Sequence, residues 1–155
     1  MKAGAQRRRH PGAAWAAAAL ACCAAAPAAA YEFRSVGESA AVLYDAPSAK
    51  SKKLYVVSRG YPLEVVVAVE GWSKVRDASG ELAWIEARSL AAARTVIVKV
   101  PLAQVRDRAD DGAPVAFQAQ QSVILDLLEV AGAWLHVRHR DGQTGYVRVG
   151  QVWGV

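Results

Sequence analysis

The sequence predicts an all-β protein that consists of two tandem small barrels. Trp134 lies 62 positions after Trp72, and Gly142 lies 62 positions after Gly80, with no gap between the two copies. A fixed period of this length indicates a duplicated module. No stretch shows sustained helical periodicity, and short runs of alternating apolar and polar residues are separated by turn-forming residues. These patterns are typical of small β barrels rather than of helical proteins.

The clearest element is a hairpin in the second module. Residues 134–138 and 145–149 alternate in polarity and are joined by Asp141-Gly142. An Asp-Gly pair between alternating segments is a strong hairpin signal, because the turn needs positive φ and glycine supplies it at little steric cost. The first module repeats this hairpin over residues 72–85, which predicts the same pair of strands there.

The other elements follow the same order in both modules. Before the hairpin, each module has five segments in the same order: an alternating strand, a short strand, a polar loop, another short strand and a long strand. Module one also has a helical turn after the hairpin. In module one these segments are residues 31–36, 41–44, 45–51, 54–57, 63–69 and 86–90. In module two they are residues 95–98, 103–106, 107–114, 115–117 and 123–130. Residues 91–93 form a short linker, so we expect module one over residues 31–93 and module two over residues 94–155.

Residues 1–30 have the pattern of an export signal. A basic start is followed by an apolar run over residues 13–26, too short to span a bilayer, and then by small residues at 28–30. We expect this segment to be cleaved, so that the mature chain is periplasmic or secreted and has no membrane span. The alternatives are a retained membrane anchor and a lipoprotein attached through Cys22, because Leu20-Ala21-Cys22 loosely resembles a lipobox.

Removal of residues 1–30 changes the charge and the thiol content of the chain. Four of the 19 Lys and Arg residues lie in that segment, which leaves 15 against 14 acidic residues. The high pI therefore describes the targeting segment and does not predict nucleic-acid binding. Cys22 and Cys23 are lost as well, which excludes disulfides and thiolate chemistry in the mature chain. Two modules of about sixty residues have marginal cores, so we expect them to stabilise each other by packing.

The motifs in module two carry a family resemblance. Trp134, Val137-Arg138, Asp141-Gly142 and residues 145–147 resemble the closing hairpin of the bacterial SH3-like (SH3b) domain, which occurs here twice. Module one is the weaker match, with Ala83 where the family favours glycine and Ser79 in place of the turn aspartate. The resemblance implies SH3-type barrels of five to six short strands with a single helical turn. It also implies an exported protein with a binding or structural role. We expect no cofactor.

The mature chain offers no catalytic constellation. Its two histidines, His136 and His139, are three positions apart on a strand and turn, so they point to opposite faces and form no metal pair. A serine hydrolase needs a serine, a base and an oxyanion hole brought together, and the sequence positions no such group. SH3b modules often accompany a cysteine peptidase domain, for which no cysteine remains. We expect no enzymatic activity; the alternative is a small hydrolase with a compact Ser/His/Asp or carboxylate site.

The tryptophans are the candidate recognition residues. If Val75 and Val137 face the cores, strand alternation places Trp72 and Trp134 on the outer faces, beside cationic side chains. Exposed aromatic rings next to cations suit ligand recognition. The alternative is that both tryptophans pack between the modules. We expect Trp153, beside Val155, to close the second barrel by packing. The predicted ligand-binding residues are Tyr44, Trp72, Lys74 and Arg76 in module one, and Trp134, His136, Arg138 and Tyr146 in module two.

The expected partner is a peptidoglycan peptide or a segment of an envelope protein. Eukaryotic SH3 domains, which this fold resembles, bind polyproline with a Pro and a Tyr near the last helical turn. Those places hold Glu86 and Ser89 in module one, and Arg148 and Gln151 in module two, which argues against polyproline binding. The alternative is an assembly partner in an envelope protein complex that binds no small ligand.

Overall fold

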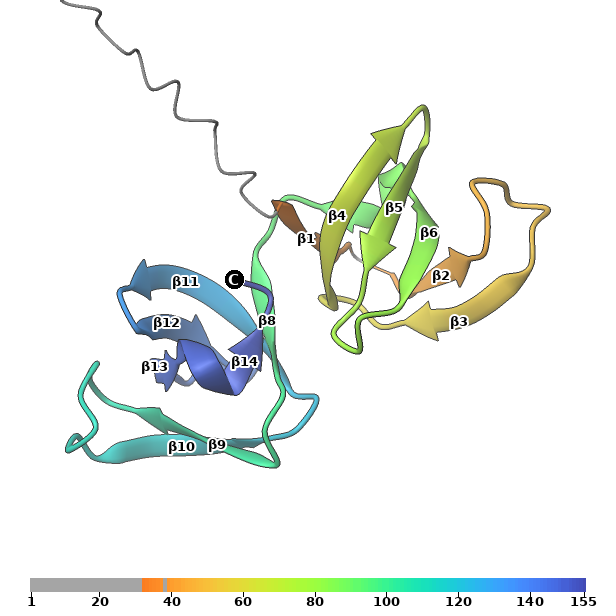
Figure 1. Ribbon diagram of the computed structural model, residues 1–155. Coiled ribbons are helices and arrows are strands. Elements are labelled where there is room, and N and C mark those ends of the chain that lie inside the picture. The colour runs from red at the N-terminus through yellow and green to blue at the C-terminus, as the bar shows by residue number, and fades with distance from the viewer. Residues whose placement is uncertain (1–31, 38) are drawn as a thin grey trace, which may run out of the picture.

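The computed structural model describes residues 32–37 and 39–155, which form two modules lying side by side (Figure 1). The predicted export signal, residues 1–30, lies outside the described residues. Each module is one seven-stranded sheet bent around its own core, which confirms the all-β fold class. In the described part of the chain, no helix has the length and apolarity needed to cross a membrane.

Module one contains seven strands and one 3-10 turn, which sits between the last two strands. All strand pairs in its sheet are antiparallel, and the spatial order is β3-β2-β6-β5-β4-β1-β7. The elements are β1 (Glu32–Val36), β2 (Ala41–Tyr44), β3 (Lys53–Val57), β4 (Pro62–Val69), β5 (Trp72–Arg76), β6 (Leu82–Glu86), η1 (Ala87–Ser89) and β7 (Leu90–Ala91).

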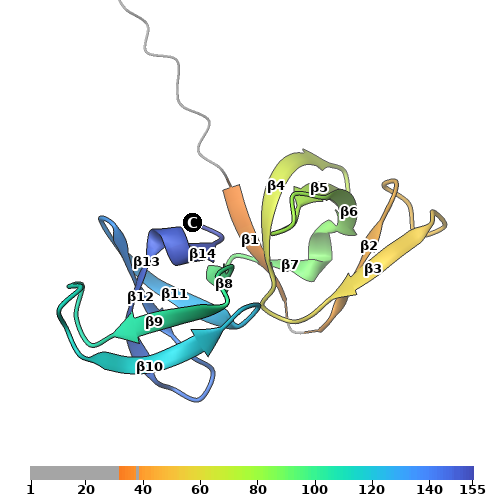
Figure 2. The same ribbon diagram turned by 60° about the horizontal axis from the view of Figure 1, so that its bottom comes forward.

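Module two repeats this topology strand for strand, in the order β10-β9-β13-β12-β11-β8-β14 (Figure 2). Its elements are β8 (Thr95–Val98), β9 (Leu102–Arg106), β10 (Val115–Gln120), β11 (Ile124–Ala131), β12 (Trp134–Arg138), β13 (Thr144–Arg148), η2 (Val149–Gln151) and β14 (Val152–Trp153). Each sheet has more strands than the expected five to six. The two-residue strands β7 and β14 return to pair with the first strand of their own module.

Each core is built from the inward side chains of alternating strands. Val75 and Ile85 in module one, and Leu135 and Val147 in module two, are at most 1% exposed. Because successive side chains on a strand point to opposite faces, the neighbours of these residues lie on the outer face of each sheet. The outer faces are therefore where this fold places the predicted recognition residues.

A β-bulge interrupts the long strand at the same place in both modules. In β4 the register shifts between Val65 and Val67, and in β11 it shifts between Leu127 and Glu129. The extra residue changes which side chains face outward beyond it. Val67 lies opposite Lys74, and Glu129 lies opposite His136, so each joins the outer face of its own module.

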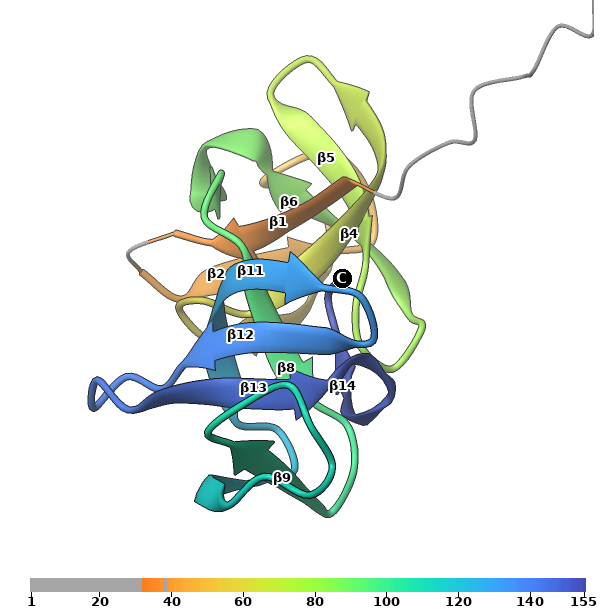
Figure 3. The same cartoon turned by 90° about the vertical axis from the view of Figure 1, so that its left-hand side faces the viewer.

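The two modules meet through β1, β4 and the turn before β4 in module one, and through β8 and β14 in module two (Figure 3). The Phe33 and Trp153 rings are edge-to-face with centroids 5.0 Å apart, and the Arg94 guanidinium lies 5.7 Å from the Phe33 centroid. The buried Thr95 hydroxyl donates a hydrogen bond of 2.6 Å to the Gly60 carbonyl. The expected packing between modules is therefore present, and the linker is residues 92–94, because Ala91 belongs to β7.

The turn between β5 and β6 is held by a carboxylate that its counterpart in module two lacks. Asp77 is 7% exposed and accepts hydrogen bonds from the Ser79 hydroxyl at 2.6 Å, from the Tyr55 hydroxyl at 2.7 Å and from two backbone amides. Burial alone would raise the pKa of Asp77, but these hydrogen bonds outweigh it and lower the pKa below 3.8. In module two His139 occupies this turn position and accepts no such set of bonds.

We expect Asp77→Asn to destabilise module one by about 1–2 kcal/mol at pH 7, because the amide nitrogen cannot accept the Tyr55 proton. A depressed folded pKa contributes stability above the ordinary value of 3.8, and this contribution is lost as the pH falls through the folded pKa. The difference between wild type and Asp77→Asn should therefore shrink below pH 3.8. Urea unfolding at pH 7, 4 and 3 measures it; a difference that grows at low pH would contradict the assignment.

Candidate functional site

The outer face of module one gathers aromatic side chains from three adjacent strands. Tyr44 on β2 lies opposite Trp84 on β6, and Trp84 in turn lies opposite Lys74 on β5. Residues directly opposite in an antiparallel pair present their side chains on the same face. Val67 continues this row beyond Lys74. The sheet register therefore brings two of the predicted residues, Tyr44 and Lys74, onto one continuous surface with Trp84 and Val67.

Trp72 joins this surface from the start of β5. Its ring is edge-to-face with the Tyr44 ring, with centroids 5.4 Å apart and an interplanar angle of 86°. Tyr44 is 7% exposed, whereas Trp72 and Trp84 are half-buried and keep part of each ring open to solvent. Aromatic rings in this arrangement give a rigid apolar contact surface at a low cost in conformational entropy. We call Tyr44, Trp72, Lys74 and Trp84 the aromatic face of module one.

The two cations of this surface differ in how they are compensated. Arg76 donates to both carboxylate oxygens of Glu64, at 3.0 and 2.8 Å. Lys74 makes no ion pair within residues 32–37 and 39–155. The predicted ligand-binding role of Arg76 remains a prediction, but its charge is already balanced, and Lys74 is the cation that the aromatic face offers to a ligand.

The equivalent surface of module two has different chemistry. His136 stacks on Tyr146, with ring centroids 4.7 Å apart. Arg106 lies opposite Tyr146, at the place where module one has Tyr44 opposite Trp84. The strand register thus brings the predicted His136 and Tyr146 together, as the alternation of β12 and β13 implies. The surface is polar around this pair, because Glu129 replaces the valine of module one.

Trp134 is covered, and the prediction that it is exposed is wrong. The side chain is 7% exposed because the Arg148 guanidinium lies over its ring, 4.3 Å from the centroid. Arg148 is held there by an ion pair with Asp111 from the loop between β9 and β10, and its hydrogen bond to that carboxylate lowers the pKa of Asp111. In module one the residue opposite Trp72 is Glu86, which pairs with Arg88 and leaves the Trp72 ring without such a cover.

The alternative that Trp72 and Trp134 pack between the modules is also wrong. Their aromatic and cationic contacts are with residues of their own modules, whereas the aromatic pair across the junction is Phe33 with Trp153. Trp153 was expected to close the second barrel; β14 does pair with β8, but the ring reaches module one. The sequence alone does not show which of the five tryptophans meets another module.

Two features of the site escaped the sequence reasoning. Trp84 is part of the aromatic face but is not among the predicted ligand-binding residues. The covering role of Arg148 was not predicted, although one signal was present: the repeat position that holds Glu86 in module one holds Arg148 in module two. Predicted Arg138 lies away from Trp134, where it pairs with Asp126 at 3.0 Å. The described residues contain no group of three or more His, Cys, Asp or Glu side chains that could hold a metal ion.

Comparisons with known proteins agree with the duplicated architecture. The family model "Bacterial SH3 domain" matches the chain twice, at residues 37–91 and 99–154. No curated protein matches the chain. Three similar solved structures are NlpC2 and NlpC1 from Trichomonas vaginalis and an NLPC/P60 family protein from Bacillus cereus.

These structural similarities are distant. NlpC2 and NlpC1 are each 14% identical to this chain, with a TM-score of 0.38. The alignment with NlpC2 covers 81% of this chain, the alignment with NlpC1 covers 85%, and each covers 49% of the other protein's chain. The Bacillus cereus protein is 16% identical with a TM-score of 0.38, with 79% of this chain and 56% of that chain covered. The chain thus spans about half the length of these proteins. The two family matches cover most of the sequence, and the chain belongs to the bacterial SH3 domain family, with two domains in tandem.

Proposed function

We propose that this chain is an exported, non-catalytic binding protein whose aromatic face in module one recognises a short peptide. The peptide is a peptidoglycan stem peptide or a segment of an envelope protein. Bacterial SH3 domains are generally binding modules, and the class of ligand is our inference from the chemistry of this face. The rings supply apolar contact area, and Lys74 supplies a cation for a carboxylate of the ligand.

The observation that carries this proposal is the unequal cover of two equivalent tryptophans. Trp72 is half-buried beside Tyr44, whereas Trp134 is 7% exposed beneath Arg148. A duplicated module in which one copy has its tryptophan closed by an ion-paired arginine favours a division of roles. Module one presents the ligand surface, and module two supports it through the junction.

The proposal predicts a binding defect that is confined to module one. Trp72→Ala and Trp84→Ala should each weaken binding of purified peptidoglycan fragments by about 30-fold, the loss typical of a hot-spot aromatic residue. The matched control is Tyr146→Ala, because Tyr146 is the half-buried residue at the repeat position of Trp84. Isothermal titration of the full chain measures the affinity, and circular dichroism checks that each variant is folded.

Three outcomes decide the question. Loss of affinity in the module one variants alone supports the proposal. Equal losses in Tyr146→Ala would place the ligand on both modules or elsewhere and would contradict it. If neither the peptidoglycan fragments nor envelope-derived peptides bind the protein, the assembly role is favoured. In that role the aromatic face is buried against a protein partner.

A further inference from the structure

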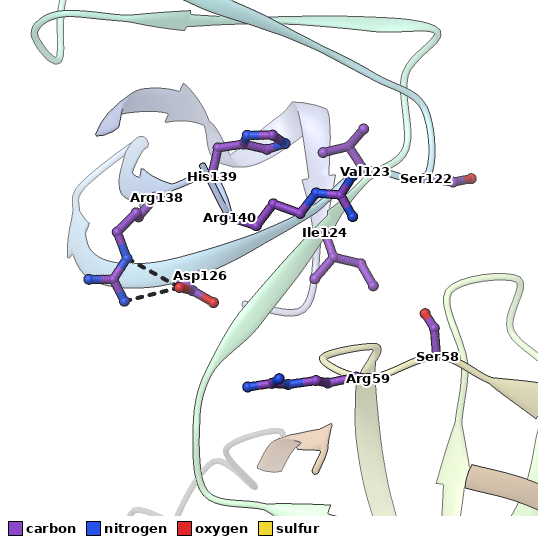
Figure 4. Close-up of a pocket in the computed structure, with 9 residues that line it drawn as sticks. All are labelled: Ser58, Arg59, Ser122, Val123, Ile124, Asp126, Arg138, His139 and Arg140. Atoms are coloured by element: carbon purple, nitrogen blue, oxygen red, sulfur yellow. Dashed lines mark hydrogen bonds and ion pairs between the residues drawn. The ribbon is translucent and has the colours of Figure 1, made fainter. Parts of the chain in front are cut away.

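A cleft of about 860 Å³ lies at the junction of the two modules, away from the aromatic face. One wall is the turn between β3 and β4 of module one, which supplies Ser58 and Arg59 (Figure 4). The opposite wall belongs to module two and supplies Arg138, His139 and Arg140 from the end of β12 and the turn that follows it. The cleft therefore exists because the modules are packed together, and neither module forms it alone.

The charges around this cleft are unbalanced. The Arg138 guanidinium lies 3.0 Å from Oδ2 of Asp126, and His139 Nδ1 lies 2.9 Å from Oδ1 of Asp141. Arg138 and His139 therefore already have acidic partners. Arg59 and Arg140 make no ion pair and no side-chain hydrogen bond within residues 32–37 and 39–155. Two exposed arginines from different modules thus line one cleft, and the carboxylate that also lines it, Asp126, is already paired with Arg138.

The floor between these arginines is apolar. Val123 and Ile124 are half-buried and line the cleft, and Figure 4 shows the Arg140 side chain lying beside them, with Arg59 on the opposite side. A guanidinium group matches a carboxylate through two parallel hydrogen bonds. A ligand that uses both arginines and the floor needs two anionic groups with an apolar group between them.

We propose that this cleft binds an acidic peptide segment in which two carboxylate side chains flank an apolar one. Arg59 binds one carboxylate and Arg140 binds the other, while the apolar side chain packs on Val123 and Ile124. A polyphosphate chain would satisfy the arginines but would leave the apolar floor without a contact, and for this reason we favour the peptide. This site is separate from the aromatic face of module one and does not depend on the function proposed for it.

The junction contacts hold the segment that carries Arg59 against module two. Thr95 at the start of β8 donates to the carbonyl of Gly60, the residue next to Arg59. The backbone that carries Arg59 is therefore tied to the first strand of module two. A preorganised pair of cations binds with a smaller entropy cost than two groups on independently moving domains.

The test uses the full chain and a fluorescein-labelled peptide that contains Glu-Leu-Glu, followed by fluorescence anisotropy. Arg59→Ala and Arg140→Ala should each weaken binding about tenfold, which corresponds to the loss of one charge-assisted contact. The control is Arg108→Ala, which removes an exposed arginine in the loop between β9 and β10 without touching the cleft. Trp72→Ala should leave the affinity unchanged.

Several results would overturn the proposal. A second peptide carries Gln-Leu-Gln in place of Glu-Leu-Glu. If it binds with the same affinity as the Glu-Leu-Glu peptide, the carboxylates are not recognised. An equal loss in Arg108→Ala would show that attraction to any surface arginine explains the binding. Binding of tripolyphosphate that depends on Arg59 and Arg140, without binding of the Glu-Leu-Glu peptide, would make the cleft a phosphate site instead. A loss of affinity in Trp72→Ala would place the peptide on the aromatic face.

Discussion

Gly145→Ala is expected to destabilise module two by about 3 kcal/mol, at the upper end of the range for overpacked cores. Gly145 lies in β13, where an added Cβ would stand 2.7 Å from the backbone oxygen of Arg106 and 2.8 Å from a methyl carbon of Val105. Val105 is fully buried, and a backbone carbonyl of the neighbouring strand cannot move without disturbing the sheet. Because modules of this size have marginal cores, this loss is a large share of the stability of module two.

The matched control for this substitution is Gly150→Ala. Gly150 lies in η2 of the same module, and an added Cβ there meets nothing within 4 Å. Its substitution should change the free energy of unfolding by less than about 0.5 kcal/mol. Urea unfolding followed by circular dichroism compares the two variants. Similar unfolding midpoints for Gly145→Ala and the wild type would mean that β9 and β13 are less closely packed than described.

Gly154→Ala is expected to open the junction between the modules. Gly154 has φ of +117°, and an added Cβ would lie 2.7 Å from the Thr95 carbonyl oxygen and 3.1 Å from Cβ of Pro62. The unfavourable backbone conformation and the collision together should cost about 3 kcal/mol. Displacement of this segment also removes the hydrogen bond from Arg94 to the Gly154 carbonyl and moves Trp153 away from Phe33.

The opened junction should be visible by limited proteolysis. Trypsin cleavage after the exposed Arg94 should become faster in Gly154→Ala than in the wild type, because the linker loses its contacts with both modules. Gly150→Ala again serves as the control. The Glu-Leu-Glu peptide should also bind Gly154→Ala more weakly, because Arg59 and Arg140 are carried by different modules. Cleavage at the wild-type rate would show that residue 154 does not hold the modules together.

Local patterns made the fold predictable from the sequence. Strand alternation around Val75 and Val137 correctly separated the core from the outer face, and glycine at the turn positions Gly80 and Gly142 adopts positive φ in both hairpins. These signals depend on residues within a few positions of each other, and the repeat supplied each of them twice. The fold class and the duplicated family resemblance followed from them and are confirmed.

The cover on Trp134 could not be predicted in the same way. It depends on an ion pair between Arg148 and Asp111, two residues on different strands and loops that approach only after the sheet has closed. Alternation assigns a side chain to a face, but it does not say which long neighbour will lie across that side chain. The same limit applies to the junction cleft, because the positions of Arg59 and Arg140 relative to each other depend on how two separate barrels pack.

The contact between Phe33 and Trp153 imposes an order on the assembly of the molecule. Phe33 belongs to the first strand of module one, and Trp153 belongs to the last strand of module two. Because the chain is synthesised from the N-terminus, module one can complete its sheet long before Trp153 has been added. Module one must therefore wait with the Phe33 ring uncovered until module two has formed, and the two barrels lock together only after both sheets are complete.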